Sequence, residues 1–163
     1  MLIKMIYDIT KALDPTRPVI DTSGNFHVVT DIFDIHDYCQ NVDEFALHYK
    51  DRLYNNFPNR QTHKGEPYFI SEYGGIKWDN TGSSGWGYGD SPKTEEEFIE
   101  RYKGLTDVLL NNENIFGFCY TQLYDVEQEV NGLMTYDRKF KFDPGIIRKI
   151  NIQKAAIEQK SGS

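Results

Sequence analysis

The stretch from Pro67 to Gly75, which reads Pro-Tyr-Phe-Ile-Ser-Glu-Tyr-Gly-Gly, decides the fold. Its aromatic and β-branched residues predict a strand, and the two glycines end it. The strand is apolar almost up to Glu72, which is typical of a strand in a parallel sheet covered by helices. A carboxylate at the point where a buried strand leaves the core costs stability unless it is paired or hydrogen-bonded. Glu72 is therefore a candidate functional residue, and the structural alternative is an ion pair with an arginine at the rim.

The rest of the sequence predicts strands that alternate with amphipathic helices. Strands are expected at 18–21, 28–36 and 115–121, and helices at about 2–13, 41–54, 94–111 and 143–157. Asn41, Thr94 and Asp143 are the expected helix N-caps. The order predicts an α/β protein with parallel strands. The predicted strands end in polar residues, at Asp21, His36-Asp37, Glu72 and Gln122, which is typical of the catalytic face of an α/β barrel.

Composition narrows the class of protein. The chain has 163 residues and a net charge of −7, which argues against a nucleic-acid binder, and its 39% hydrophobic residues argue against disorder. Neither a membrane span nor a signal peptide is visible, and the compartment is not readable. Cys39 and Cys119 lack the spacing of a zinc site or a disulfide framework, so both are expected to be buried thiols. The glycines do not form a phosphate loop, which disfavours a nucleotide-binding protein.

Aromatic residues make up 14% of the chain, more than a small core needs, so some rings are expected to face a ligand. A loop of about twenty residues after Gly75 carries several of them. It holds Gly82, Gly85, Gly87, Gly89, Trp78, Trp86 and Tyr88. Such rings suit stacking on the apolar face of a sugar. Trp78 is preferred for this role because it lies closest to Glu72 in sequence, and the alternative is that one of the rings holds the loop in place.

His36, Asp37 and Tyr38 stand together at the end of a predicted strand. Their grouping favours ligand contact, whereas each alone would more often be a hydrogen-bonded rim residue. With Asp34 and His27 they could also be metal ligands, but their spacing is not one typical of a metal site. We expect neither a metal nor a cofactor.

Four motifs in this order resemble glycoside hydrolase family 2, the family of β-galactosidases, β-glucuronidases and β-mannosidases. They are Asp14-Pro15-Thr16-Arg17-Pro18-Val19, His36-Asp37-Tyr38, Ser71-Glu72-Tyr73-Gly74-Gly75 and the segment from Asn131 to Arg138. The resemblance implies the C-terminal half of a (β/α)8 TIM barrel, strands five to eight, over residues 1–160, with 161–163 as a tail. It also implies that Glu72 is the catalytic nucleophile of a retaining β-glycosidase.

A retaining mechanism needs a second carboxyl group as acid/base. In the family this is the Glu of an Asn-Glu pair at the end of strand four, upstream of this chain. Asn112-Glu113 is an Asn-Glu pair, but it precedes the last predicted strand and so falls at the opposite end of a barrel. We therefore expect the chain to be a fragment that is inactive alone. Its expected partners are the missing N-terminal half of the barrel and the β-sandwich domains, and open sheet edges would allow self-association.

The resemblance also bears on the substrate. Many members have a Trp on strand eight where this chain has Phe118-Cys119-Tyr120-Thr121-Gln122, so Tyr120 or Gln122 is expected to line the site, with core packing as the alternative for Tyr120. Family β-glucuronidases carry Asn-x-Lys where this chain has Glu129-Val130-Asn131, so a neutral sugar, β-galactoside first, is expected. The competing hypotheses are a non-catalytic carbohydrate-binding or assembly module and, third, a nucleotide-binding protein.

Overall fold

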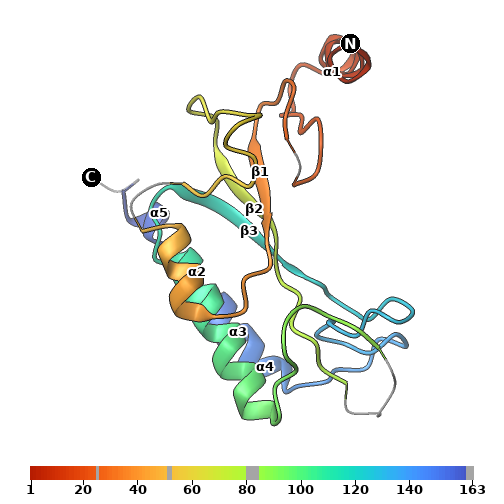
Figure 1. Cartoon of the computed structure of the whole chain (residues 1–163), viewed down its shortest axis with the longest axis vertical. Helices are drawn as coiled ribbons and strands as arrows, with labels where there is room; N and C mark the ends of the chain where they lie inside the picture. Colours follow the sequence, from red (N-terminus) through yellow and green to blue (C-terminus); the bar gives the residue numbers. More distant parts are fainter. Residues whose placement is uncertain (25, 51–52, 80–84, 161–163) are drawn as a thin grey trace.

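The computed structural model describes residues 1–163 apart from 25, 51–52, 80–84 and 161–163, and it has an α/β fold (Figure 1). The strands are β1 (Phe33–Asp37), β2 (Tyr68–Gly74) and β3 (Ile115–Thr121), which form one parallel sheet in the order β1-β2-β3. The helices are α1 (Leu2–Leu13), α2 (Val42–His48), α3 (Glu95–Leu110), α4 (Pro144–Asn151) and α5 (Ala156–Lys160). The predicted α/β class and parallel sheet are confirmed, and the arrangement is consistent with part of a barrel.

The hydrophobic core lies between the sheet and a layer of helices. Figure 1 shows α2, α3 and α4 on one side of the sheet, and α3 contacts both of the others. Side chains of β1, β2 and β3 meet helix side chains there. The most buried of them are Ile35, Ile70, Phe45, Phe98 and Leu105, each with 0% of its surface exposed. Burial of this apolar surface orders the strands. In the described part of the chain no helix lies on the opposite, uncovered face of the sheet (Figure 1).

The predicted N-caps are confirmed. The Thr94 hydroxyl accepts the amide hydrogen of Glu97 at 3.2 Å at the start of α3. Asn41 accepts the amides of Asp43 and Glu44 at the start of α2, and Asp143 accepts the amide of Gly145 at the start of α4. Each cap satisfies backbone donors that have no partner inside the helix.

The strand predicted at 18–21 does not form, and the strand predicted at 28–36 is reduced to β1. The amides of Val28 and Val29 bond to the Asp21 carboxylate, at 2.6 and 3.0 Å, instead of to another strand. Along the outer edge of β1, the His27 ring contacts the backbone of Asp34 and the Asn56 amide donates to the carbonyl of His36 at 2.7 Å. Side chains thus form hydrogen bonds with the backbone groups of β1 that a fourth strand would need for pairing.

Two helices are shorter than predicted. The helix expected at 41–54 is α2, which ends at His48 because Tyr49 turns inward and bonds to Asp37. The helix expected at 143–157 is divided into α4 and α5. Between them the side chain of Gln153 donates to the carbonyl of Ile150, and the Glu158 carboxylate accepts the amide of Ala155 as α5 begins.

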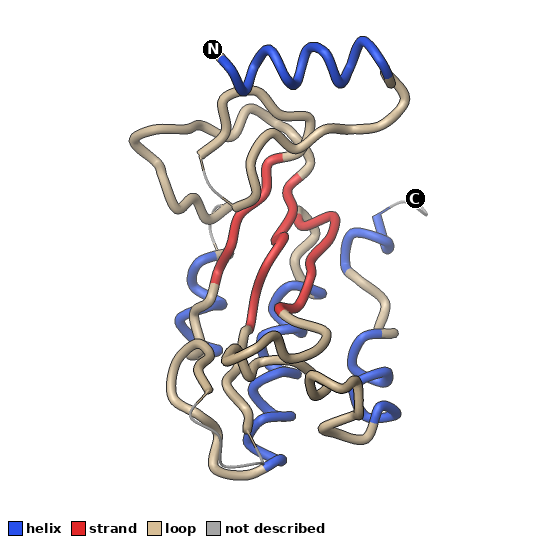
Figure 2. Tube along the Cα trace, turned by 90° about the vertical axis from the view of Figure 1, so that its right-hand side faces the viewer, coloured by secondary structure: helices blue, strands red, loops and turns tan. Residues whose placement is uncertain are grey.

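The helix α1 is confirmed but stands apart from the core. Figure 2 shows it beyond the end of the sheet at which the strands begin. It has no buried residue, and its apolar side chains are exposed, among them Met5, Ile6 and Ile9. Its side chains bond to Asp31, through the Tyr7 hydroxyl and Lys11, and Lys11 also donates to the carbonyl of Arg17 at 3.0 Å. Among the helices that the structure describes, none has both the length and the apolar composition needed to cross a membrane.

A buried lysine joins the connections that follow β2 and β3. The Lys141 ammonium group donates to the Asp125 carboxylate at 2.7 Å and to the carbonyl of Trp78 at 2.8 Å, and the carbonyl of Val130 lies at 3.4 Å. Its side chain is 2% exposed and that of Asp125 is 11% exposed. The backbone of Trp86 also exchanges hydrogen bonds with the segment at Gln128 and Val130. One charge pair therefore holds these connections together beside the C-terminal ends of the strands.

We predict that Lys141→Met lowers the free energy of unfolding by about 3–5 kcal/mol, because it leaves the Asp125 carboxylate buried without its cation. The matched control is Lys139→Met, which breaks an exposed ion pair with Asp137 and is expected to cost about 1 kcal/mol or less. Urea denaturation of both variants measures the difference. Equal losses for the two variants would show that the buried pair is not a structural anchor.

Candidate active site

An extra residue in β2 places Glu72 on the uncovered face of the sheet. Ile35 pairs with Ile70, whereas His36 pairs with Glu72, so Ser71 has no counterpart in β1. The pairing with β3 is irregular over the same residues. Tyr68 and Ile70 point into the core, and with strict alternation Glu72 would follow them. The irregularity is a β-bulge, which turns Glu72 outward and returns Tyr73 to the core.

Glu72 is held by two side chains from the end of β1. The Tyr38 hydroxyl donates to its Oε2 atom, and the Nδ1 atom of His36 lies 3.3 Å from the same oxygen. The Glu72 side chain is 35% exposed, so its carboxylate stays open to solvent while two neighbours orient it. The structure thus brings together His36, Tyr38 and Glu72 from the predicted site.

A second ring fixes Tyr38 from behind. Tyr88 stacks on it with ring centroids 3.5 Å apart and planes within 6°. Gly75 makes this contact possible, because its φ is +60° and a Cβ atom there would lie 2.4 Å from the Tyr88 ring. Burial, and next the hydrogen bond to Glu72, raise the pKa of Tyr38 well above its usual range. The hydroxyl therefore remains a proton donor to Glu72 at every ordinary pH.

The aromatic residues of the long loop divide into two groups. Trp78 packs against Phe98 and Phe142 and is partly buried at the core. Trp86 is 50% exposed and meets Tyr88 edge-on at 5.9 Å. The ring in direct contact with the Glu72 cluster is therefore Tyr88, which sequence proximity to Glu72 does not identify. Gly82 lies outside the described residues.

Asp37 lies next to the cluster in sequence but faces the helices. It is 4% exposed, and its Oδ2 atom bonds to His48 at 2.7 Å and to the Tyr49 hydroxyl at 2.9 Å. The structure therefore does not bring it together with Glu72. The strand alternation that puts His36 on one face of β1 puts Asp37 on the other.

The residues predicted at the end of β3 take part in local hydrogen bonds. The Tyr120 hydroxyl accepts the amide of Ile76 and donates to the carbonyl of Asn131, both at 3.2 Å. Gln122 donates to the Asn131 side chain at 2.9 Å. Both residues thus connect the end of β3 to the segment that follows it. Cys119 is exposed on the uncovered face and Cys39 is half-buried, so the expectation of two buried thiols is wrong.

The described residues hold no group of three or more His, Cys, Asp or Glu side chains arranged to bind a metal. Asp34 and His27, which the sequence raised as possible ligands, bond to protein groups instead. Asp34 accepts from Ser71 and Gly24, and His27 contacts the Asp21 carboxylate at 2.7 Å.

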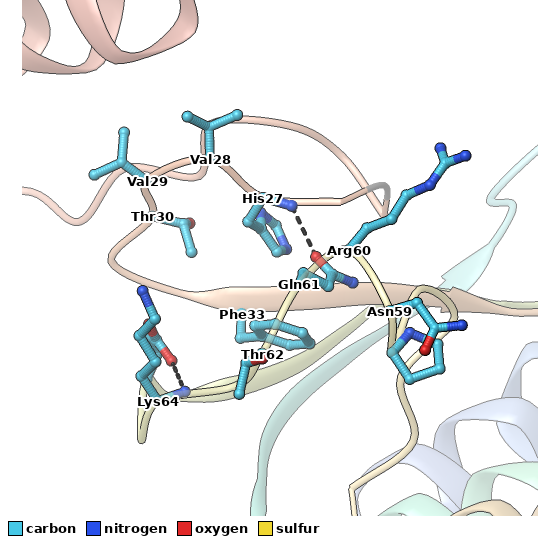
Figure 3. Close-up of a pocket in the computed structure, with 12 residues that line it drawn as sticks. His27, Val28, Val29, Thr30, Phe33, Asn59, Arg60, Gln61, Thr62 and Lys64 are labelled. Atoms are coloured by element: carbon cyan, nitrogen blue, oxygen red, sulfur yellow. Dashed lines mark hydrogen bonds between the residues drawn. The ribbon is translucent and has the colours of Figure 1, made fainter.

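A separate cavity of about 520 Å³ lies at the other end of the sheet (Figure 3). Its lining includes Phe33, where β1 begins, and the residues that lead into β2, and His27 donates its amide to Gln61 there at 2.7 Å. Asn112 and Glu113 also precede a strand, in the turn before β3. The Asn-Glu pair is thus at the end of the sheet opposite to Glu72.

The comparison with protein-family profiles finds no match, and the comparison with curated protein sequences finds none either. Solved structures do match. A glycoside hydrolase family 2 β-galacturonidase from Eisenbergiella tayi has a TM-score of 0.64 at 16% identity, over 93% of this chain and 30% of that chain. A β-glucuronidase from Faecalibacterium prausnitzii has a TM-score of 0.62 at 19% identity, over 94% and 28%. One from Lactobacillus rhamnosus has a TM-score of 0.62 at 19% identity, over 93% and 29%.

This chain spans less than a third of the length of each of these enzymes. Identities below 20% establish likeness of fold and leave activity and substrate open. The resemblance to glycoside hydrolase family 2 that the sequence predicts is confirmed in the fold, which this chain shares with part of a family 2 β-galacturonidase and of β-glucuronidases.

Proposed function

We propose that this chain is the nucleophile-bearing part of a retaining β-glycosidase of glycoside hydrolase family 2, in which β1, β2 and β3 correspond to barrel strands six to eight and residues 18–21, which form no strand, take the position of strand five. The observation that carries the proposal is the Glu72 carboxylate, solvent-accessible at the C-terminal end of β2 and oriented by Tyr38 and His36. The catalytic groups of α/β barrels lie at this C-terminal end of the parallel strands.

Glu72 would act by double displacement. One carboxylate oxygen attacks the anomeric carbon, a glycosyl ester forms, and the bond to the leaving oxygen breaks as that oxygen takes a proton from the acid/base. Water then attacks the same carbon, gives its proton back to the acid/base and releases both the sugar and the Glu72 carboxylate. The hydroxyl of Tyr38 keeps the carboxylate in place for the first step.

The acid/base would come from outside this chain. In retaining enzymes it lies about 5–5.5 Å from the nucleophile. Asp37 faces the helices, and Glu129 accepts from the side chain of Asn131, so neighbouring carboxylates serve other contacts. We propose that the remaining half of the barrel, with β-sandwich domains, supplies the acid/base and covers the exposed apolar side of α1. Without that half, the exposed apolar side of α1 would favour self-association.

We propose a neutral β-glycoside, β-galactoside first, as the substrate. The triplet Glu129-Val130-Asn131 offers no cation for a sugar carboxylate, and Asn131 is fully buried with its amide bonded to Glu129. The enzymes of similar fold are a β-galacturonidase and β-glucuronidases, so the neutral substrate proposed here differs from the uronides that their names state.

Glu72→Gln is expected to abolish turnover of an aryl β-galactoside, by on the order of 10⁴-fold or more, in the full-length protein that carries this chain. The loss follows because an amide cannot form the glycosyl ester. The matched control is Glu113→Gln, at the other end of the sheet, which should retain activity. Mass spectrometry after a 2-deoxy-2-fluoroglycoside should find the label on the peptide that contains Glu72. Binding of sugars without turnover or label would instead favour the carbohydrate-binding module.

The 163-residue chain alone is expected to give no turnover of aryl β-glycosides, because it lacks the acid/base. Glycoside hydrolysis by the isolated chain that Glu72→Gln removes would contradict the proposal that the chain needs a partner.

In the full-length protein, kcat/KM should be higher for the β-galactoside than for the β-glucuronide or β-galacturonide with the same aryl group. A higher kcat/KM for either uronide would refute the neutral substrate and leave the proposed nucleophile untouched.

Tyr38→Phe is expected to lower kcat/KM by about 10–100-fold, the value of one hydrogen bond to a charged group. The hydroxyl orients the carboxylate, so its loss should lower kcat with little change in KM. Tyr136→Phe, at an exposed tyrosine, is the control. An unchanged kcat/KM in Tyr38→Phe would show that this hydroxyl does not position the nucleophile.

A further inference from the structure

We propose that Asp34 is a positioning residue for Glu72, which it holds in its outward orientation through the hydroxyl of Ser71. Sequence patterns do not identify Asp34 or Ser71 in this role. The sequence signal for this role is the spacing of residues in β2. Glu72 is an even number of residues from the buried Tyr68 and Ile70, so regular alternation would bury it, and a solvent-facing Glu72 requires an irregularity in the strand.

Ser71 is the extra residue of the bulge, and its side chain is bonded across to β1. Its hydroxyl donates to the Oδ2 atom of Asp34, and the carbonyl of Ile35 is a more distant acceptor at 3.3 Å. Ser71 has no partner residue in the register between β1 and β2. The bond to Asp34 therefore fixes the residue that determines on which face Glu72 emerges.

Asp34 is itself rigidly placed, with 1% of its surface exposed. Its Oδ2 atom also accepts the amide of Gly24 at 2.8 Å. Gly24 has a φ of +59°, and a Cβ atom there would lie 2.0 Å from the His36 ring, so only glycine fits. The same turn thus supports the Asp34 carboxylate and packs against His36, one of the two side chains that contact Glu72.

Behind Asp34 lies a second pair of buried titratable groups. His27, with its side chain 5% exposed, places Nε2 at 3.4 Å from Asp34 Oδ1 and Nδ1 at 2.7 Å from Asp21. Burial would raise the pKa of Asp21, but the amides of Val29 and Val28 and the His27 ring hold it below its ordinary value. Asp21 therefore stays ionised and fixes the His27 ring that borders Asp34.

The two carboxylate oxygens of Asp34 have different neighbours. Oδ1 is buried and accepts no hydrogen bond from the described protein groups, with His27 Nε2 at 3.4 Å. The oxygen that is satisfied, Oδ2, serves Ser71 and Gly24, which are the two contacts that set the positions of Glu72 and His36.

The first test uses the 163-residue chain and needs no activity. Ring resonances of Tyr38, followed by NMR at one fixed pH, should move in Glu72→Gln, because the Tyr38 hydroxyl contacts Glu72. They should also move in Ser71→Ala and Asp34→Asn and keep their positions in Ser71→Thr, which keeps the hydroxyl. The control is Thr106→Val, which removes a buried hydrogen bond to Tyr73 on the helix side of β2 and should lower stability while the Tyr38 resonances keep their positions.

A merely structural role would lower the melting temperature of Ser71→Ala and Asp34→Asn but leave the Tyr38 ring resonances in place, and that result overturns the proposal. Tyr38 resonances that do not respond to Glu72→Gln also overturn it, since Glu72 would then not be held by Tyr38.

The second test rests on the proposed function and measures inactivation of the full-length protein by a 2-deoxy-2-fluoro-β-galactoside. Ser71→Ala should slow the covalent step by about 10²-fold with little change in inhibitor binding, as expected for a nucleophile displaced by about 1 Å. Ser71→Thr should restore the rate. Equal labelling rates in the unmodified protein and Ser71→Ala refute the positioning role alone, whereas an unmodified protein that is never labelled refutes the proposed function.

Discussion

Strict alternation along β2 would place Glu72 beside Tyr68 and Ile70, against the helices, where an ionised carboxylate has no water. One inserted residue, Ser71, reverses this and leaves Tyr73 to fill the core position. The strand keeps an unbroken apolar face while it delivers a charge to the opposite side. The contacts of Glu72 with His36 and Tyr38, and the stacking of Tyr88 behind them, all depend on that reversal.

The connections after β2 and β3 behave structurally as one unit. Figure 1 shows them near each other beyond the C-terminal end of the sheet, and backbone bonds at Trp86 and the ammonium group of Lys141 join them. The ring of Tyr88 belongs to this unit, which supports Tyr38. The orientation of Glu72 therefore has two supports, the buried polar cluster around Asp34 on the β1 side and the packed loops on the β3 side.

Local signals in the sequence predict the elements that have local causes. Thr94 caps α3 through its own side chain, and the apolar run 67–73 forms a strand inside the sheet, so both follow from the residues themselves. The run 18–21 is equally β-branched, but a strand needs a neighbour to pair with, and side chains take that place along β1. In the candidate site, His36, Tyr38 and Glu72 were predictable from their strand ends. The preference for Trp78 over Tyr88 was not reliable, because distance along the chain says little about which ring of a folded loop reaches the carboxylate.

The side chains along the outer edge of β1 also affect the tendency of the chain to aggregate. Exposed edges of β-sheets are templates on which other chains add strands and begin to aggregate. At this edge the His27 ring contacts the backbone of Asp34, and Asn56 already bonds to the carbonyl of His36. An incoming strand would have to exchange these bonds rather than add new ones. The edge is therefore a poor nucleus for intermolecular sheet growth, even though no strand covers it in the described part of the chain.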